Sequence, residues 1–152
     1  MRDERKECAK SFIASLYSPC GGRVPLPKEV KRRINEWFQL AIEKISREEF
    51  TFLTRLGDRL EVVSEIFPDE LWSKELIFAS MVIAVMGLTI DRRYKKFTDY
   101  EKERVRQILK TYVEEIGTAV TEEDVSRLHS ALRDLCFNVY RLLIYGLGGE
   151  IS

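Results

Sequence analysis

The sequence has few of the residues that build metal centres. It contains one histidine, His129, and three cysteines, none of them in a Cys-x-x-Cys pair. A di-iron site in a helical bundle uses paired Glu-x-x-His motifs, and a structural zinc site uses closely spaced cysteines or histidines. His129 flanks an apolar seam, so we expect a structural or solvent-edge histidine. We expect no bound metal ion and no cofactor.

The cysteines are also too few and too scattered to form a disulfide framework. Cys8 and Cys136 stand beside apolar helical positions and are expected to be buried thiols, whereas Cys20 lies in a glycine- and proline-rich loop. The first ten residues, MRDERKECAK, carry too many charges for a secretory signal. These features favour a reducing, cytoplasmic location.

The chain carries no net charge, because 25 basic residues balance 25 acidic ones. A global attraction to nucleic acid or to an anionic membrane is therefore not expected. Charged residues make up 33% of the sequence, yet only four side chains are amides. This composition is similar to that of proteins from thermophiles.

The longest apolar run covers residues 76–90 and contains no charged residue. Its apolar side chains occupy every side of a helical wheel, which predicts a helix surrounded by protein or by lipid. As a helix the run spans about 22 Å, less than the roughly 30 Å of a bilayer core. Charged residues stand at both of its ends. We therefore predict a core helix over residues 69–87 and no membrane span.

Apolar residues elsewhere recur at three- and four-residue spacings, the pattern of amphipathic helices. The further helices are expected over residues 4–17, 27–45, 46–67 and 98–117, and after residue 121. Together with the apolar run they predict a single all-α domain over residues 1–152, with about six helices packed around a central hydrophobic helix. No convincing partner strand is found for a β-sheet.

Local signals set the expected helix ends. Ser46-x-x-Glu49 and Thr98-x-x-Glu101 have the pattern of capping boxes, in which each side chain binds a backbone N–H that the helix leaves free. Gly87 and Gly117 are expected to end the central and the fifth helix. Thr121 is expected to cap the last helix.

Carboxylate clusters are the remaining candidates for catalysis. Glu61 and Glu65 share one helical face, and Glu122, Glu123 and Asp124 are consecutive. Helical pyrophosphatases bind magnesium through Glu-x-x-Glu and Glu-x-x-Asp pairs, and neither cluster has that spacing. No nucleophile has an identifiable base beside it. We therefore expect a non-enzymatic protein, and keep a magnesium-dependent hydrolase as the third hypothesis.

Two basic regions stand out from the neutral whole. Residues 92–97 read RRYKKF, and three further cations follow at four-residue spacing on the next helix; a second group follows Pro27. One interpretation is contact with single-stranded RNA or DNA, through cations on the phosphates and Tyr94 or Phe97 on a base; the other is a solvated helix surface. The candidate nucleic-acid-binding residues are Arg92, Arg93, Tyr94, Lys95, Lys96, Phe97, Lys102, Arg106, Lys110, Lys28, Lys31, Arg32 and Arg33.

A second strongly apolar region lies near the end of the sequence. Between residues 135 and 149 the only charge is that of Arg141. We expect this region to pack on the central helix or on a second subunit. The candidate interface residues are Val139, Leu142, Leu143, Ile144, Tyr145 and Leu147.

These observations favour a non-enzymatic helical subunit of a larger assembly, which binds other protein subunits and contacts RNA or DNA through a basic face. Its size, all-α plan and composition are similar to those of the small helical subunits of type III CRISPR effector complexes, an analogy of class that no shared motif carries. The alternative is a homo-oligomeric scaffold that binds protein, with the last helix as its interface and no nucleic-acid role.

Overall fold

The computed structural model describes residues 26–66 and 70–145, and for residues 70, 71 and 145 the backbone alone. Every regular element in these ranges is helical, which confirms the all-α prediction. Five α-helices and a short 3₁₀ helix follow one another as α2 (Lys28–Ser46), α3 (Phe52–Ile66), α4 (Glu70–Arg93), η1 (Tyr94–Lys96), α5 (Asp99–Thr121) and α6 (Val125–Tyr145). The helix predicted over residues 4–17 lies outside the described residues.

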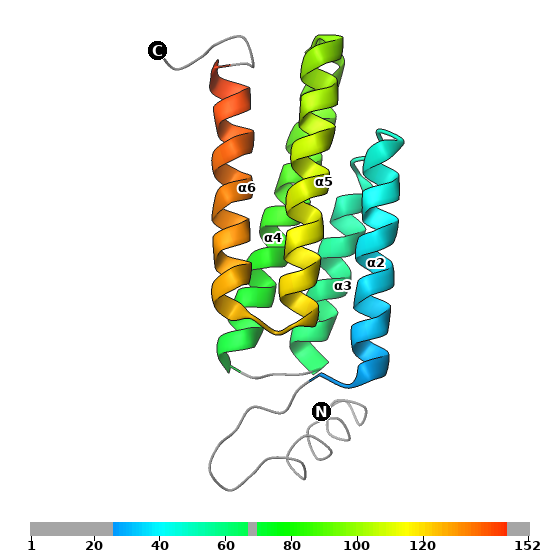
Figure 1. Ribbon diagram of the computed structural model, residues 1–152, viewed down its shortest axis with the longest axis vertical. Helices are drawn as coiled ribbons and strands as arrows, with labels where there is room; N and C mark the ends of the chain where they lie inside the picture. Colours follow the sequence, from blue (N-terminus) through cyan, green and yellow to red (C-terminus); the bar gives the residue numbers. More distant parts are fainter. Residues whose placement is uncertain (1–25, 67–69, 146–152) are drawn as a thin grey trace, which may run out of the picture.

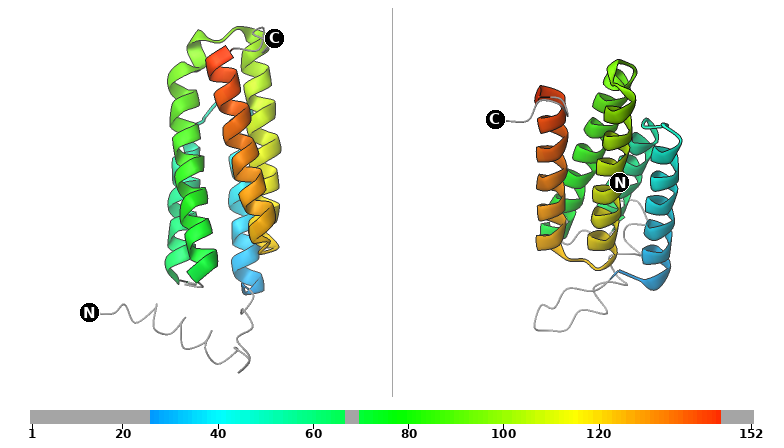
Figure 2. Two further views of the ribbon diagram at one scale, coloured as in Figure 1. Left: turned by 90° about the vertical axis from the view of Figure 1, so that its left-hand side faces the viewer. Right: turned by 45° about the horizontal axis from the view of Figure 1, so that its top comes forward.

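The five helices run roughly along one long axis and form two layers (Figures 1 and 2). Helices α2, α5 and α6 make one layer, in which α5 packs against both neighbours. Helices α3 and α4 make the other layer and contact each other along their length. Contacts of α4 with α6 and of α2 with α3 join the two layers.

The hydrophobic core fills the space between the layers. Helix α4 contributes Trp72, Leu76, Ile83 and Ile90 to it, each at most 1% exposed. The opposite side of α4 faces outward, because a helix in a two-helix layer is covered only on its inner and lateral sides. The predicted packing of the other helices around a central helix is therefore not confirmed in the described part of the chain, because α4 is covered on one side only.

Glycines let helices approach closely at three crossings. A Cβ atom on Gly57 would lie 2.7 Å from the backbone oxygen of Ser80, and one on Gly87 would lie 2.7 Å from Leu53 Cβ. A Cβ on Gly117 would lie 2.7 Å from Cγ of Phe38. The prediction that Gly87 and Gly117 end helices is wrong, since α4 and α5 continue past both glycines. These glycines serve close packing.

The turns after α2 and α5 share one conformation. Glu48 and Glu123 have φ angles of 64° and 56°, in the left-handed region that few residues other than glycine adopt. In each turn the next residue donates its N–H back into the helix, 2.9 Å from a carbonyl oxygen five residues earlier. Each carboxylate also binds a distant element: Glu48 Oε1 accepts from Arg106, and Glu123 Oε2 accepts from Leu26 N at 3.0 Å.

One of the two predicted capping boxes is confirmed. Thr98 Oγ1 accepts from Glu101 N at 3.1 Å, and Glu101 Oε1 accepts from Thr98 N at 3.0 Å. The box at Ser46 is wrong: α2 runs through Ser46, whose hydroxyl donates to Ile42 O. The cap at Thr121 is wrong too.

Helix α5 includes Thr121, because Ala119 and Val120 are still buried against the core. Asp124 caps α6 instead, since its Oδ1 accepts from Arg127 N at 3.0 Å.

Candidate interaction surfaces

The outward side of α4 carries a row of exposed apolar side chains, here called the α4 stripe. Each of its members is between 41% and 60% exposed: Ile77, Phe78, Met81, Val85 and Leu88. Four of them stand at alternating three- and four-residue spacing, which is the spacing of a coiled-coil seam. The sequence showed these residues as apolar and gave no sign of which side of α4 would be exposed.

The α4 stripe is larger than the scattered apolar exposure of ordinary surfaces. Its five side chains expose on the order of 500 Å² together, which matches the largest patch on a typical soluble monomer. Single exposed apolar residues are normal, whereas the largest contiguous patch on a monomer is often functional. The α4 stripe is therefore a candidate docking surface.

Charges of opposite sign lie at the two ends of the face that carries the α4 stripe. Gly57 of α3 lies against Ser80, and Ser73 Oγ donates to Ser64 O at 3.2 Å. This pairing places Glu61 of α3 level with the beginning of the stripe, and its side chain is exposed. Exposed Arg92 follows the stripe at the other end of α4.

A group of exposed cations surrounds the end of α4 and is here called the basic end. It consists of Arg92, Arg93, Lys95 and Lys96. Within the described ranges, none of these four cations has a carboxylate oxygen within 4.0 Å of its charged nitrogen atoms. Residues 91–110 hold eight basic and four acidic side chains, so this segment carries an excess of positive charge.

Tyr94 lies inside the bundle at the basic end. Tyr94 is 7% exposed. The centroid of its ring lies 4.6 Å from the ring centroid of Phe50 and 5.4 Å from Lys102 Nζ. Its hydroxyl accepts a hydrogen bond from Arg106 Nη1 at 2.7 Å. Burial raises the pKa of the Tyr94 hydroxyl. The ring is thus occupied by its neighbours and has no face open for a base, and half-buried Phe97 packs edge-on against it.

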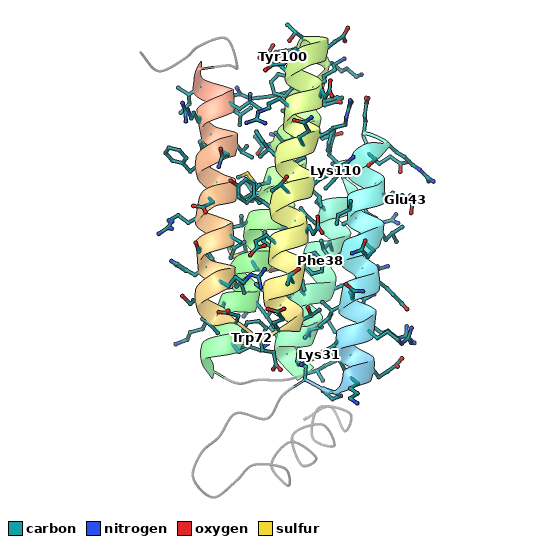
Figure 3. All side chains as sticks on the ribbon, viewed as in Figure 1. Lys31, Phe38, Glu43, Trp72, Tyr100 and Lys110 are labelled. Carbon is teal, nitrogen blue, oxygen red and sulfur yellow. The ribbon has the colours of Figure 1, made fainter. Side chains whose placement is uncertain are left out.

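The structure separates the two predicted basic regions. Figure 3 places Lys31 at one end of the bundle and Tyr100, which follows the basic end, at the other, with Lys110 partway along α5. Arg32 forms ion pairs with Glu29 and Glu36. Lys31 Nζ lies 3.5 Å from Glu123 Oε2, and Arg33 Nε lies 3.7 Å from Glu29 Oε1; exposed Lys28 begins the helix. The candidate nucleic-acid-binding residues therefore do not share one face.

Helix α6 buries part of the predicted interface. Val139 and Leu142 are buried in the core of the bundle, in agreement with the first of the two predicted alternatives, packing on the central helix. Leu143 is half-buried, Ile144 is exposed, and Leu147 and the Tyr145 side chain lie outside what the structure describes. The sequence analysis missed exposed Phe137 and Tyr140. Phe137, Tyr140 and Ile144 follow one another at spacings of three and four residues on the side opposite the seam, and this spacing was the available signal.

The candidate carboxylates have contacts in the turn between α5 and α6. Glu122 pairs with Arg127, Glu123 accepts from Leu26 N, and Asp124 caps α6. Among the described residues there is no cluster of three or more histidine, cysteine, aspartate or glutamate side chains that could hold a metal ion. A polar groove of about 540 Å³ lies between α5 and α6 and contains the Glu115–Arg127 ion pair.

Two other predicted side chains lie near the surface. His129 is exposed, with Nδ1 3.7 Å from Glu75 Oε2. Cys136 is half-buried, and burial raises the pKa of its thiol. Neither side chain has the neighbours of a catalytic nucleophile in the described structure.

Comparison with protein-family models, curated proteins and solved structures finds no match to this chain. The segment Trp72–Lys96 is long and apolar enough to cross a membrane by length and composition alone, and 44% of its most apolar window is buried in the bundle. The core helix of a soluble protein meets the same criterion. The α4 stripe and the basic end are therefore the features from which a function can be proposed.

Proposed function

We propose that this protein is a non-enzymatic helical assembly subunit that binds another protein molecule through the α4 stripe. The observation that carries the proposal is the exposed seam of Phe78, Met81, Val85 and Leu88 on α4. A helix or a helical face of a partner that presents apolar residues at the same spacing would fit this seam.

Burial of the α4 stripe supplies enough free energy for specific association. On the order of 500 Å² of apolar surface at about 25 cal/mol per Å² corresponds to roughly 12 kcal/mol from one partner. The loss of translational and rotational freedom offsets about 4–15 kcal/mol of the total. The partner's own buried surface adds to the gain, so the balance favours a complex of moderate affinity.

Site-specific photocrosslinking in the native host tests this proposal. Met81 in the α4 stripe is replaced by the photoreactive residue p-benzoylphenylalanine, and Leu40, an exposed aliphatic residue on α2, receives the same replacement as the matched control. We expect a discrete protein crosslink from position 81 that is absent from position 40. Equal crosslinking at both positions, or none at position 81, contradicts the proposal.

The basic end favours a second candidate function, which is contact with a nucleic acid. Its four exposed cations have no ion-pair partner among the described residues, so they are available to phosphate groups. The nucleoprotein setting inferred from the sequence, of the kind formed by CRISPR effector complexes, depends on this surface. Tyr94 takes no part in it because its ring is buried.

Fluorescence anisotropy with single-stranded RNA and DNA across a salt series tests this second function. Replacing Arg92, Arg93, Lys95 and Lys96 by alanine should weaken binding and reduce the salt slope by about one unit for each lost phosphate contact. The matched control replaces Lys28, Lys31, Arg32 and Arg33, at the other end of the bundle, and should leave binding nearly unchanged. Salt-insensitive or absent binding by the unmodified protein removes the nucleic-acid role.

A further inference from the structure

We infer that the partner of the α4 stripe is the α4 stripe of a second copy of this chain, in antiparallel orientation. The inference rests on the proposed function, because it takes the stripe to be a docking surface. The sequence suggested a self-association interface on the last helix, whereas we infer that this interface lies on α4.

The seam is complementary to itself when one copy is reversed. Antiparallel pairing about the middle of the seam puts Phe78 of one copy opposite Leu88 of the other, and Met81 opposite Val85. A large side chain then faces a smaller one at each level, as knobs-into-holes packing requires. The same patch is used by both copies, as in an isologous two-fold interface.

Charges on the same face select the antiparallel orientation. Reversal brings Arg92 of one copy level with the beginning of the other copy's stripe, where exposed Glu61 of α3 lies. Lys74 lies at the same level and opposes this attraction. Parallel pairing would instead place Arg92 against Arg92 and Lys74 against Lys74, with no acidic side chain of α3 level with Arg92. The level of Glu61 with Arg92 is therefore specific to the antiparallel pair.

The available area fits a reversible dimer. Two stripes bury on the order of 1,000 Å² together, which is the lower limit for a specific interface. An interface of this size belongs to the class of weak, reversible associations. The dimer should weaken with salt, because part of its orientation depends on exposed ion pairs.

Sedimentation equilibrium over a concentration series tests self-association of the full chain. The unmodified protein should reach the dimer mass as its concentration rises. Val85→Asp should lower the association constant at least tenfold, because it places a charge in the seam, whereas Leu40→Asp on α2 should leave the constant unchanged. A strictly monomeric protein, or equal effects of the two substitutions, overturns the inference.

Charge exchange tests the Glu61–Arg92 contact independently of packing. Glu61→Arg should weaken the dimer several-fold at low salt, and adding Arg92→Glu in the same chain should restore it. Failure of the second substitution to rescue association overturns the proposed pairing. Both positions are exposed, so neither change is expected to disturb the fold.

Disulfide trapping determines the orientation. In a chain with Cys8, Cys20 and Cys136 replaced by alanine, Phe78→Cys and Leu88→Cys are made as separate variants. Antiparallel pairing predicts crosslinked heterodimers when the two variants are mixed and oxidised, with little crosslinking of either variant alone. Homodimeric disulfides from each variant alone contradict it.

The photocrosslinking experiment separates failure of this inference from failure of the proposed function. A crosslink from position 81 to a different protein, with a monomeric purified chain, overturns self-pairing and leaves the docking function intact. A crosslink from position 81 to residues 1–25 of the same chain overturns both. A crosslink to a second copy supports both.

Discussion

Helices α2 and α4 bury similar inner faces and expose opposite kinds of outer face. Ile34 and Phe38 of α2 and Leu76 and Ile83 of α4 all lie in the same core. The outer face of α2 carries ion pairs at helical spacing, such as Arg47–Glu43 with a nitrogen–oxygen distance of 2.6 Å. The outer face of α4 carries the apolar α4 stripe.

This difference shows which helix surface is adapted to water. A charged outer face keeps α2 solvated and adds little to stability, because exposed ion pairs contribute little. An apolar outer face on α4 adds nothing to the isolated bundle and invites association. The two helices therefore share one core but differ in the outer face, and it is the outer face of α4 that we propose serves binding.

The largest expected effect contrasts the two sides of α4. Ile83→Ala removes buried apolar atoms and should lower the free energy of unfolding by about 2–5 kcal/mol. Val85→Ala lies in the α4 stripe and should lower it by less than about 1 kcal/mol. Urea unfolding at low protein concentration measures both. Comparable losses would show that the stripe is covered within the monomer.

The next-largest effects concern two glycines at helix crossings, Gly57 between α3 and α4 and Gly117 between α5 and α2. In Gly57→Ala the new methyl group meets the backbone oxygen of Ser80, so α3 and α4 must move apart. The strain of about 1–3 kcal/mol should exceed the gain of about 1 kcal/mol in helix propensity. In Gly117→Ala the new methyl group meets Cγ and Cβ of Phe38, which is 2% exposed and has no room to rotate away, so a loss of similar size is expected. Thermal unfolding of the two variants measures both losses, and an increase in stability from either substitution would contradict the packing role of that glycine.

The confirmed capping box at the start of α5 should have a moderate effect. Thr98→Ala removes the acceptor for Glu101 N and should lower the free energy of unfolding by about 1 kcal/mol. Thr98→Ser keeps the hydroxyl and should retain most of the stability. Denaturant unfolding measures both variants, and equal losses would show that the hydroxyl is unimportant.

The smallest effect concerns an ion pair in the layer of α5 and α6. The hydrogen bond from Arg127 lowers the pKa of Glu115. A carboxyl group with a lowered pKa in the folded protein stabilises the fold above its unfolded pKa, near 4.5, and loses this contribution as the pH falls through the folded pKa.

Glu115→Gln should therefore be slightly less stable than the unmodified protein at neutral pH. The difference should shrink as the pH falls below about 4.5. Both partners are about two-fifths exposed, so solvent screening keeps the effect small. Unfolding curves over a pH series measure it, with Glu29→Gln on α2 as a more exposed comparison; a difference that grows with acid would contradict the assignment.

Local sequence signals predicted the features that depend on local contacts, namely the helices and one helix start. The spacing of apolar residues predicted helices, and the Thr98 box predicted the start of α5 because both partners lie within one turn. The similar pattern at Ser46 failed because the helix continues through it while Ile45 is still buried. A capping pattern acts only where tertiary packing allows the helix to begin.

The candidate surfaces depended on long-range packing and were predicted less well. A helix that is apolar on every side gives no sign of which side its neighbours leave open, so the α4 stripe could not be identified. The basic residues of α2 and of the basic end are similar in sequence, but the chain places them at opposite ends of the bundle. The spacing of Val139 and Leu142 on the apolar seam of the last helix allowed for their burial against the central helix, whereas the exposed row of Phe137, Tyr140 and Ile144 was recognised only at Ile144.

The glutamates in the left-handed turns make local structure depend on the whole bundle. Glycine would adopt this conformation freely, whereas glutamate costs roughly 1–2 kcal/mol there. The cost is offset by contacts with distant elements: Glu48 with Arg106 of α5, and Glu123 with Leu26 before α2. An isolated pair of neighbouring helices lacks these contacts. Each chain reversal is therefore stabilised by an element distant in the sequence, and both contacts couple α2 with α5 inside one layer of the bundle.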